Sequence, residues 1–85
     1  MSQELKVLTF AWVRTLSGEA ECEITTQATT VGELLADLIA HRPGWDALAA
    51  RQSQIRCAIN QRFVERDASL HTAVEVAFFP PVTGG

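Results

Sequence analysis

The sequence predicts an α+β roll, in which one main helix and one short helix cover one face of a mixed sheet of about four to five strands. Three observations support this fold class. Several short segments alternate apolar and polar residues at period two, and one longer segment carries apolar residues at helical spacing. The helical segment lies between a first pair of strands and the later strands, where a right-handed crossover within one sheet would place it.

The first part of the chain predicts a hairpin. Residues 5–11 are typical of a strand, with Leu8 and Phe10 on one of its two faces. A turn or short helix at 12–16 follows, and a Ser-Gly pair ends it. Residues 20–25 then alternate small or apolar side chains with polar ones, which indicates a half-buried strand with its glutamates in water.

The main helix has the clearest pattern. Thr30 and Glu33 have the spacing of a capping box, in which the Thr side chain accepts from a free N–H and the Glu reaches back. One helical stripe follows: Val31, Leu34, Leu35, Leu38 and Ile39. The helix is expected to end near Arg42, because Pro43 disfavours helical geometry in the residue before it. A second, short helix is predicted at about 45–51, with an inner face of Trp45, Leu48 and Ala49.

The second half of the sheet is predicted from three segments. Residues 55–60 alternate, with Ile55, Cys57 and Ile59 inward. An Asn-Gln turn follows, and then a short edge segment at 63–64. Residues 74–79 form the final strand. Its core-facing residues are expected to be Val74, Val76 and Phe78. Phe79 would point outward.

Length and composition bound the functional class. Eighty-five residues, 47% apolar and 20% charged, suit one globular domain with a modest core. The net charge of −3 argues against nucleic acid or an anionic membrane as a partner. No apolar run approaches the ~20 residues of a membrane helix, and no signal peptide opens the sequence. The expected location is the cytoplasm.

Side chains suited to catalysis are sparse. Cys22 and Cys57 have no metal-ligand spacing and are expected to be reduced core residues, so no metal site is predicted. His41 and His71 stand alone in polar surroundings, as solvated surface residues do. The glycines form no phosphate-binding loop. The chain therefore does not resemble an enzyme that acts alone.

An apolar surface is predicted on the sheet face that the helices leave open. Leu8, Phe10 and Phe79 would lie there on neighbouring strands. Single exposed apolar residues are normal, but three that form a patch favour a docking site for a partner.

The last eight residues, Phe-Phe-Pro-Pro-Val-Thr-Gly-Gly, divide the chain into a domain (1–79) and an extended tail (80–85). Pro80 and Pro81 donate no N–H, so they end strand pairing. Gly84 and Gly85 lack a Cβ and form a slim tip that can enter a narrow channel. The alternative is that the small residues of this chain end have no function.

The terminal carboxylate is the most distinctive chemical group. A carboxylate is a poor electrophile, but a partner enzyme can convert it with ATP into an acyl-adenylate. The acyl group can then pass to an amine, giving an isopeptide, or to sulfide, giving a thiocarboxylate. Lys6 is the only lysine, so the chain has little capacity to build chains on itself. This mildly favours a sulfur carrier.

The segment from Val74 to Gly85, VEVAFFPPVTGG, resembles the C-terminal signature of the small subunits of molybdopterin synthase. These proteins are sulfur carriers with a ubiquitin-like β-grasp fold. Supporting matches are KVL and FA near the start, VR just after them, and INQ at 59–61. The family often has an acidic-glycine turn before the last strand, whereas this chain has Leu-His-Thr-Ala at 70–73.

The resemblance implies a reaction sequence. A ubiquitin-activating-like enzyme would use ATP and Mg to adenylate Gly85, and a sulfur donor protein would supply the sulfur of a thiocarboxylate. The tail would then enter the large subunit of molybdopterin synthase, within a heterotetramer. There it would give sulfur to cyclic pyranopterin monophosphate, forming the molybdopterin dithiolene. The chain itself would bind no cofactor and would not be catalytic alone.

The resemblance also implies roles for individual residues. The tail residues Val82, Thr83 and Gly84 would contact the partners. The partner-binding surface at the root of the tail would contain Leu8, Phe10, Phe79, Pro80 and Pro81. Two alternatives remain: a carrier of a sibling pathway, for thiamine or tungsten cofactor synthesis, and a β-grasp binding module with an inert tail.

Overall fold

A computed structural model describes residues 2–81, and residues 1 and 82–85 lie outside this description. The elements in chain order are β1 (Gln3–Thr9), α1 (Ala11–Ser17), β2 (Glu21–Thr26), α2 (Val31–His41), the 3₁₀ helix η1 (Trp45–Gln54), β3 (Arg56–Ile59), β4 (Arg62–Val64) and β5 (Glu75–Phe79). The predicted α+β class and the order of the elements are confirmed.

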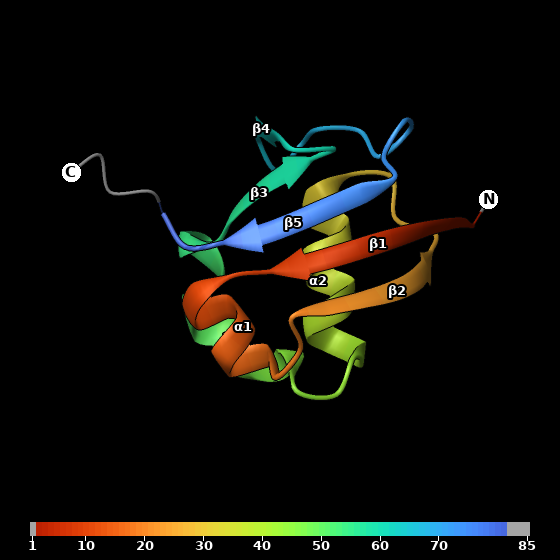
Figure 1. Ribbon diagram of the computed structural model, residues 1–85. Coiled ribbons are helices and arrows are strands. Elements are labelled where there is room, and N and C mark those ends of the chain that lie inside the picture. Colours follow the sequence, from red (N-terminus) through yellow and green to blue (C-terminus); the bar gives the residue numbers. More distant parts are fainter. Residues whose placement is uncertain (1, 82–85) are drawn as a thin grey trace.

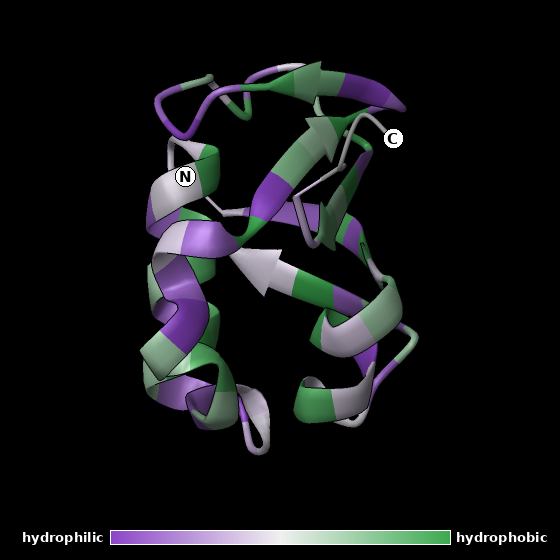
Figure 2. Ribbon diagram, turned by 90° about the vertical axis from the view of Figure 1, so that its left-hand side faces the viewer, coloured by the Kyte–Doolittle hydropathy of each residue, from purple (hydrophilic) through white to green (hydrophobic). Residues whose placement is uncertain are grey.

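The five strands form one mixed sheet in the order β2-β1-β5-β3-β4. β1 is parallel to β5 and antiparallel to β2, and β3 is antiparallel to both β4 and β5. Figure 1 shows β1 and β5 at the centre of the sheet, with α2 behind it. After a 90° turn, α2 and η1 form a layer on one side of the sheet, and their ribbons alternate hydrophilic and hydrophobic segments (Figure 2).

The core lies between this helix layer and the sheet. Its largest fully buried side chains include Trp45 and Phe78, whose rings meet edge to face with centroids 5.9 Å apart. This geometry is favoured because the positive edge of one ring meets the negative face of the other. The stripe of α2 packs here as predicted, with Val31, Leu34, Leu35 and Leu38 buried. None of the helices among residues 2–81 is long and apolar enough to cross a membrane.

Both ends of α2 follow the sequence signals, with one variation. Thr30 Oγ1 accepts from the backbone N–H of Glu33 at 3.2 Å. The Glu33 carboxylate reaches one residue farther back than a capping box requires, since it accepts from the backbone N–H and the hydroxyl of Thr29. These bonds lower the pKa of Glu33. The helix ends at His41, and Arg42 is its C-cap, as Pro43 predicted.

The predicted inner face of the short helix is wrong at one position. Trp45 and Leu48 are buried, but Ala49 is exposed. The segment is a 3₁₀ helix, which has 3.0 residues per turn, so positions three apart share a face and a position four apart turns away. The helix is also longer than predicted and continues to Gln54.

Val74 does not belong to the core, contrary to the prediction, because its side chain is 71% exposed. It lies before β5 begins, where Asn60 Oδ1 accepts from the N–H groups of Val74 and Glu75. The preceding turn closes through a bond from the Ala73 N–H to the Leu70 carbonyl. This turn places Leu70 and Ala73 in the core instead, and it forms without a glycine.

Gly44 connects α2 to η1 and lies close to Ser17 at the end of α1. Its φ is +91°, and a Cβ at this position would lie 2.6 Å from the carbonyl oxygen of Ser17. Gly18 has a similar φ of +79°, but a Cβ there would meet nothing within 4 Å. Both glycines thus occupy the left-handed region, and only Gly44 also lacks space for a side chain.

We expect Gly44→Ala to lower the free energy of unfolding by about 3 kcal/mol, because strain and a backbone clash add. The matched control, Gly18→Ala, carries the left-handed strain alone and is expected to cost about 1 kcal/mol. Urea unfolding of both variants measures the difference. Equal losses would show that the contact with Ser17 relaxes without cost.

Candidate functional site

The sheet face opposite the helix layer carries an apolar row across four strands. The strand register pairs Leu8 with Ala77, Ala77 with Ala58, and Ala58 with Phe63. Residues in register on neighbouring strands point to the same face, so these four side chains lie side by side. Phe63 is 75% exposed although it is the largest side chain of the row.

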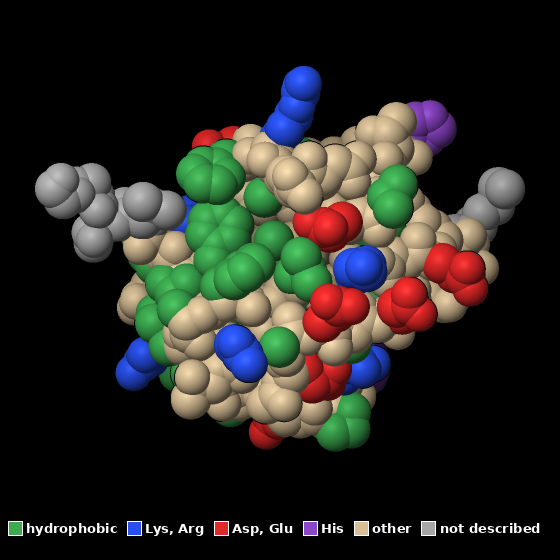
Figure 3. All heavy atoms as spheres, in the orientation of Figure 1, with side chains coloured by type: hydrophobic (Ala, Val, Ile, Leu, Met, Phe, Trp, Pro, Cys, Tyr) green, Lys and Arg blue, Asp and Glu red, His purple; other side chains and the backbone are tan. Residues whose placement is uncertain are grey.

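Two more phenylalanines extend this row toward the C-terminal end of β5. Phe79 lies two residues beyond Ala77, and its ring contacts Phe63 with centroids 5.2 Å apart. Phe10 follows β1 and is 49% exposed. We call Leu8, Phe10, Phe63, Ala77 and Phe79 the apolar patch; together they line most of a shallow hollow of about 390 Å³. Figure 3 shows hydrophobic side chains gathered at this end of the sheet.

A local backbone feature holds Phe10 in the apolar patch. Its N–H donates to the Phe78 carbonyl, which continues the pairing with β5 for one residue beyond β1. Its carbonyl then accepts from Val13 and Arg14 at the start of α1. Between these bonds, Ala11 has a φ of +52°, which is uncommon for alanine. The strand therefore ends at Thr9 rather than at the predicted Ala11.

The apolar patch lies at the root of the tail. Phe79 is its last residue, and the half-buried Pro80 and the exposed Pro81 follow directly. The prediction that Leu8, Phe10 and Phe79 share one face is confirmed. The predicted tail residues Val82, Thr83, Gly84 and Gly85 lie outside the described residues, so their roles stay predictions.

Phe63 belongs to the apolar patch, although the sequence reasoning placed it only on a short edge segment. The available signal was the two-residue turn. Asn60 and Gln61 both have positive φ, as in the tight turns of two-residue hairpins. Counting the register across such a turn sets Phe63 opposite Ala58, on the outer face.

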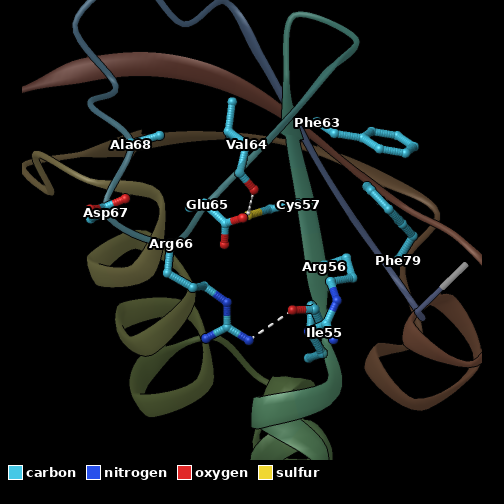
Figure 4. A pocket seen from close by; sticks show the side chains of 10 residues that line it. All are labelled: Ile55, Arg56, Cys57, Phe63, Val64, Glu65, Arg66, Asp67, Ala68 and Phe79. Atoms are coloured by element: carbon cyan, nitrogen blue, oxygen red, sulfur yellow. Dashed lines mark hydrogen bonds between the residues drawn. The ribbon is translucent and has the colours of Figure 1, made fainter.

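A second, larger hollow of about 840 Å³ borders the apolar patch at β4 and shares Phe63 and Phe79 with it (Figure 4). Two of its polar side chains, Arg66 and Cys57, are engaged in the fold. The Arg66 guanidinium donates to the carbonyls of Gln52 and Ile55. The Cys57 thiol donates to the Val64 carbonyl, and burial raises its pKa. The thiol of this hollow is therefore not activated as a nucleophile.

The two cysteines are free thiols, as predicted, but only Cys57 lies in the core, whereas Cys22 is half-buried and packs against it. Burial, together with a hydrogen bond to Glu19, raises the pKa of Cys22 to about 11. Because the thiolate is the nucleophilic form, neither cysteine is activated at neutral pH. His41 and His71 are exposed, as predicted. Within residues 2–81, no three His, Cys, Asp or Glu side chains group as metal ligands would.

Glu19 lies in the connection between α1 and β2, and its carboxylate is engaged in the fold. It precedes β2 and forms a two-pronged ion pair with Arg42, with N–O distances of 2.8 and 2.9 Å. This hydrogen-bonded guanidinium lowers the pKa of Glu19 below its ordinary value of 4.5. The pair ties the connection between α1 and β2 to the end of α2.

We expect Glu19→Gln to lower the free energy of unfolding by about 1 kcal/mol at pH 7. The folded-state pKa of Glu19 is depressed, so the stabilisation is present above pH 4.5 and is lost as the pH falls through the folded pKa. Urea unfolding from pH 7 to pH 3 should show the two proteins converging at the acid end. A difference in unfolding free energy that stays constant with pH would show that the Glu19–Arg42 ion pair is not its cause. The control is Glu23→Gln, which alters an exposed glutamate.

The fold is shared with ubiquitin-like proteins. The crystal structure of SAMP1 from Haloferax volcanii matches with a TM-score of 0.76 at 23% identity, covering 98% of this chain and all of that one. A ubiquitin from Caldiarchaeum subterraneum matches over the full length of both chains with a TM-score of 0.58 at 14% identity. The protein thus has the ubiquitin-like β-grasp fold that the resemblance implied.

Sequence comparison gives the family. The model of the ThiS family matches residues 7–85. The molybdopterin synthase sulfur carrier subunit of Escherichia coli is 43% identical over 95% of this chain and 99% of its own length, and that of Haemophilus influenzae is 35% identical over the same shares. The chain therefore belongs to the ThiS family, and the family resemblance seen in the sequence is confirmed.

A further solved structure shows a related fold in an assembly. It is a protein–protein complex of subunits 1 and 2 of molybdopterin-converting factor from Helicobacter pylori. One chain of it matches with a TM-score of 0.65 at 21% identity, covering 98% of this chain and 100% of that chain. At this identity the likeness shows the fold alone.

Proposed function

We propose that this chain is the sulfur carrier and small subunit of a molybdopterin synthase. The observation that carries the proposal is the position of the apolar patch at the root of a Pro-Pro-Val-Thr-Gly-Gly tail. When a partner covers the apolar patch, the first residue of the tail lies at a fixed position on the partner's surface. The 43% identity to the E. coli carrier subunit over nearly the whole chain supports the same role.

The chemistry takes place at the Gly85 carboxylate. A ubiquitin-activating-like enzyme with Mg-ATP joins a carboxylate oxygen to the α-phosphorus, and pyrophosphate leaves. Hydrosulfide supplied by a donor protein then attacks the acyl carbon, and AMP leaves with the former carboxylate oxygen. The product is a thiocarboxylate. This chain contributes the carbonyl carbon, which Gly85 leaves unhindered because it has no side chain.

The second half-reaction takes place on the large subunit. The thiocarboxylate sulfur passes to cyclic pyranopterin monophosphate, and water restores the carboxylate of the carrier. Two rounds supply the two sulfurs of the molybdopterin dithiolene. The catalytic groups that act on the pterin belong to the large subunit, and this chain binds no cofactor of its own.

The tail is long enough to reach an active site that lies on the large subunit. Six residues from Pro80 to Gly85 span on the order of 20 Å when fully extended. A large subunit bound at the apolar patch can therefore keep its active site well away from the interface. The Helicobacter pylori complex of two converting-factor subunits supports such an assembly, which we place in the cytoplasm as a heterotetramer of two small and two large subunits.

Reconstitution tests the proposal. The thiocarboxylated chain is mixed with its cognate large subunit and cyclic pyranopterin monophosphate, and molybdopterin is measured together with the carrier's mass. We expect two carriers to return to the carboxylate form per molybdopterin made. The unthiolated chain is the control. If the thiocarboxylate persists while the E. coli carrier turns over beside it, this chain serves another acceptor.

A further inference from the structure

The outer face of the sheet is divided by charge as well as by polarity. In the register, Lys6 lies between Glu23 of β2 and Glu75 of β5, and Leu8 pairs with Glu21. We call Glu21, Glu23 and Glu75 the acidic rim. Glu23 and Glu75 border the apolar patch on the side away from the tail, and Glu21 lies beside Leu8 at the β2 edge. Figure 3 shows these two kinds of side chain on the same face, with the acidic ones beside the hydrophobic cluster.

The acidic rim is only partly neutralised within the chain. Lys6 Nζ lies 3.8 Å from Glu21 Oε2, and both side chains are about half exposed, so this ion pair is weak. Among residues 2–81, Glu23 and Glu75 form no ion pair. The opposite end of the face carries the exposed Arg56, which is in register with Phe79. The face therefore changes from acidic to basic along the strands, toward the tail.

Such a gradient affects how a partner can dock. Charges at an interface select the orientation and speed the encounter, because like charges brought together are costly. A partner with basic side chains opposite the acidic rim would dock with the tail directed into its active site.

We propose that the acidic rim faces a strip of Lys or Arg side chains on the large subunit and fixes the orientation in which the tail enters. This inference rests on the proposed function. The occupant of the face is a surface with an apolar depression for Phe10, Phe63 and Phe79 and a basic border on the side away from the tail.

Association kinetics with the cognate large subunit test the proposal. The variant Glu21→Gln/Glu23→Gln is compared with Asp37→Asn/Asp46→Asn, which changes the net charge equally on the exposed side of the helix layer. We expect the first variant to associate roughly 3- to 10-fold more slowly at low salt and the control less than twofold. The dissociation rates should change little. The difference should vanish near 1 M salt, where screening reaches about 3 Å.

Position is tested with a photo-crosslinking amino acid in place of Glu23 or of Asp37. We expect crosslinks to a Lys- or Arg-rich peptide of the large subunit from position 23 and none from position 37. Equal slowing of both double variants, or a crosslink from position 23 to an acidic or apolar peptide, would overturn the orientation role while leaving the proposed function intact. If the unaltered chain does not bind the large subunit at any salt concentration, the proposed function fails as well.

Discussion

Adding one alanine after Gly85 is expected to abolish sulfur transfer while leaving the fold unchanged. The extra residue moves the carboxylate by about 3.3 Å and puts a methyl group beside it. A displacement of about 1 Å can cost ~100-fold in a reaction that depends on close positioning, so we expect this larger displacement to slow thiocarboxylate formation by roughly 1,000-fold or more. The measurement is the rate of thiocarboxylate formation by intact mass.

The matched control carries the same alanine after Met1. Thermal unfolding of the two variants should agree with that of the unaltered chain, because both insertions lie outside residues 2–81, which contain the described core. A tail-extended chain that is thiolated and donates sulfur at the normal rate would show that the reacting group lies elsewhere.

Phe63→Ser is expected to weaken binding of the large subunit by about 2 kcal/mol, or roughly 30-fold, as aromatic residues at the centre of an interface typically do. Its effect on folding should be small, because the Phe63 side chain is 75% exposed. Titration calorimetry measures the affinity, and urea unfolding measures the stability.

Val74→Ser is the control for Phe63→Ser. Val74 is similarly exposed, at 71%, but it precedes β5 at the end away from the apolar patch. The Val74→Ser variant should bind the large subunit with nearly unchanged affinity. Similar losses in both variants would mean that apolar exposure in general, and not the apolar patch, governs the complex.

The parts of the fold that the sequence predicted best are those in which local and long-range signals agree. α2 has a cap at Thr30, a continuous apolar stripe and a proline stop, and its bounds are confirmed. The face of η1 was misjudged at Ala49 because an apolar pattern does not distinguish 3.0 from 3.6 residues per turn over so short a segment. Val74 matched the alternation of β5. Its backbone N–H, however, donates a hydrogen bond to Asn60 Oδ1, and this tertiary contact holds the residue outside the core.

The candidate site was predicted in part for similar reasons. Alternation alone brought Leu8, Phe10 and Phe79 to one face. Phe63 required the register across the Asn60–Gln61 turn, which depends on the positive φ angles of both residues. The acidic rim also required the strand register, which sets Glu23 of β2 and Glu75 of β5 on either side of Lys6.

Intact mass spectrometry of the chain, after incubation with its activating enzyme, Mg-ATP and a sulfide source, tests the central claim most directly. Replacing oxygen by sulfur should add roughly 16 Da, and fragmentation should locate the change at Gly85. If no mass is gained while the same enzyme thiolates another carrier, the chain is a β-grasp binding module with an inert tail, and the sulfur-carrier account is contradicted.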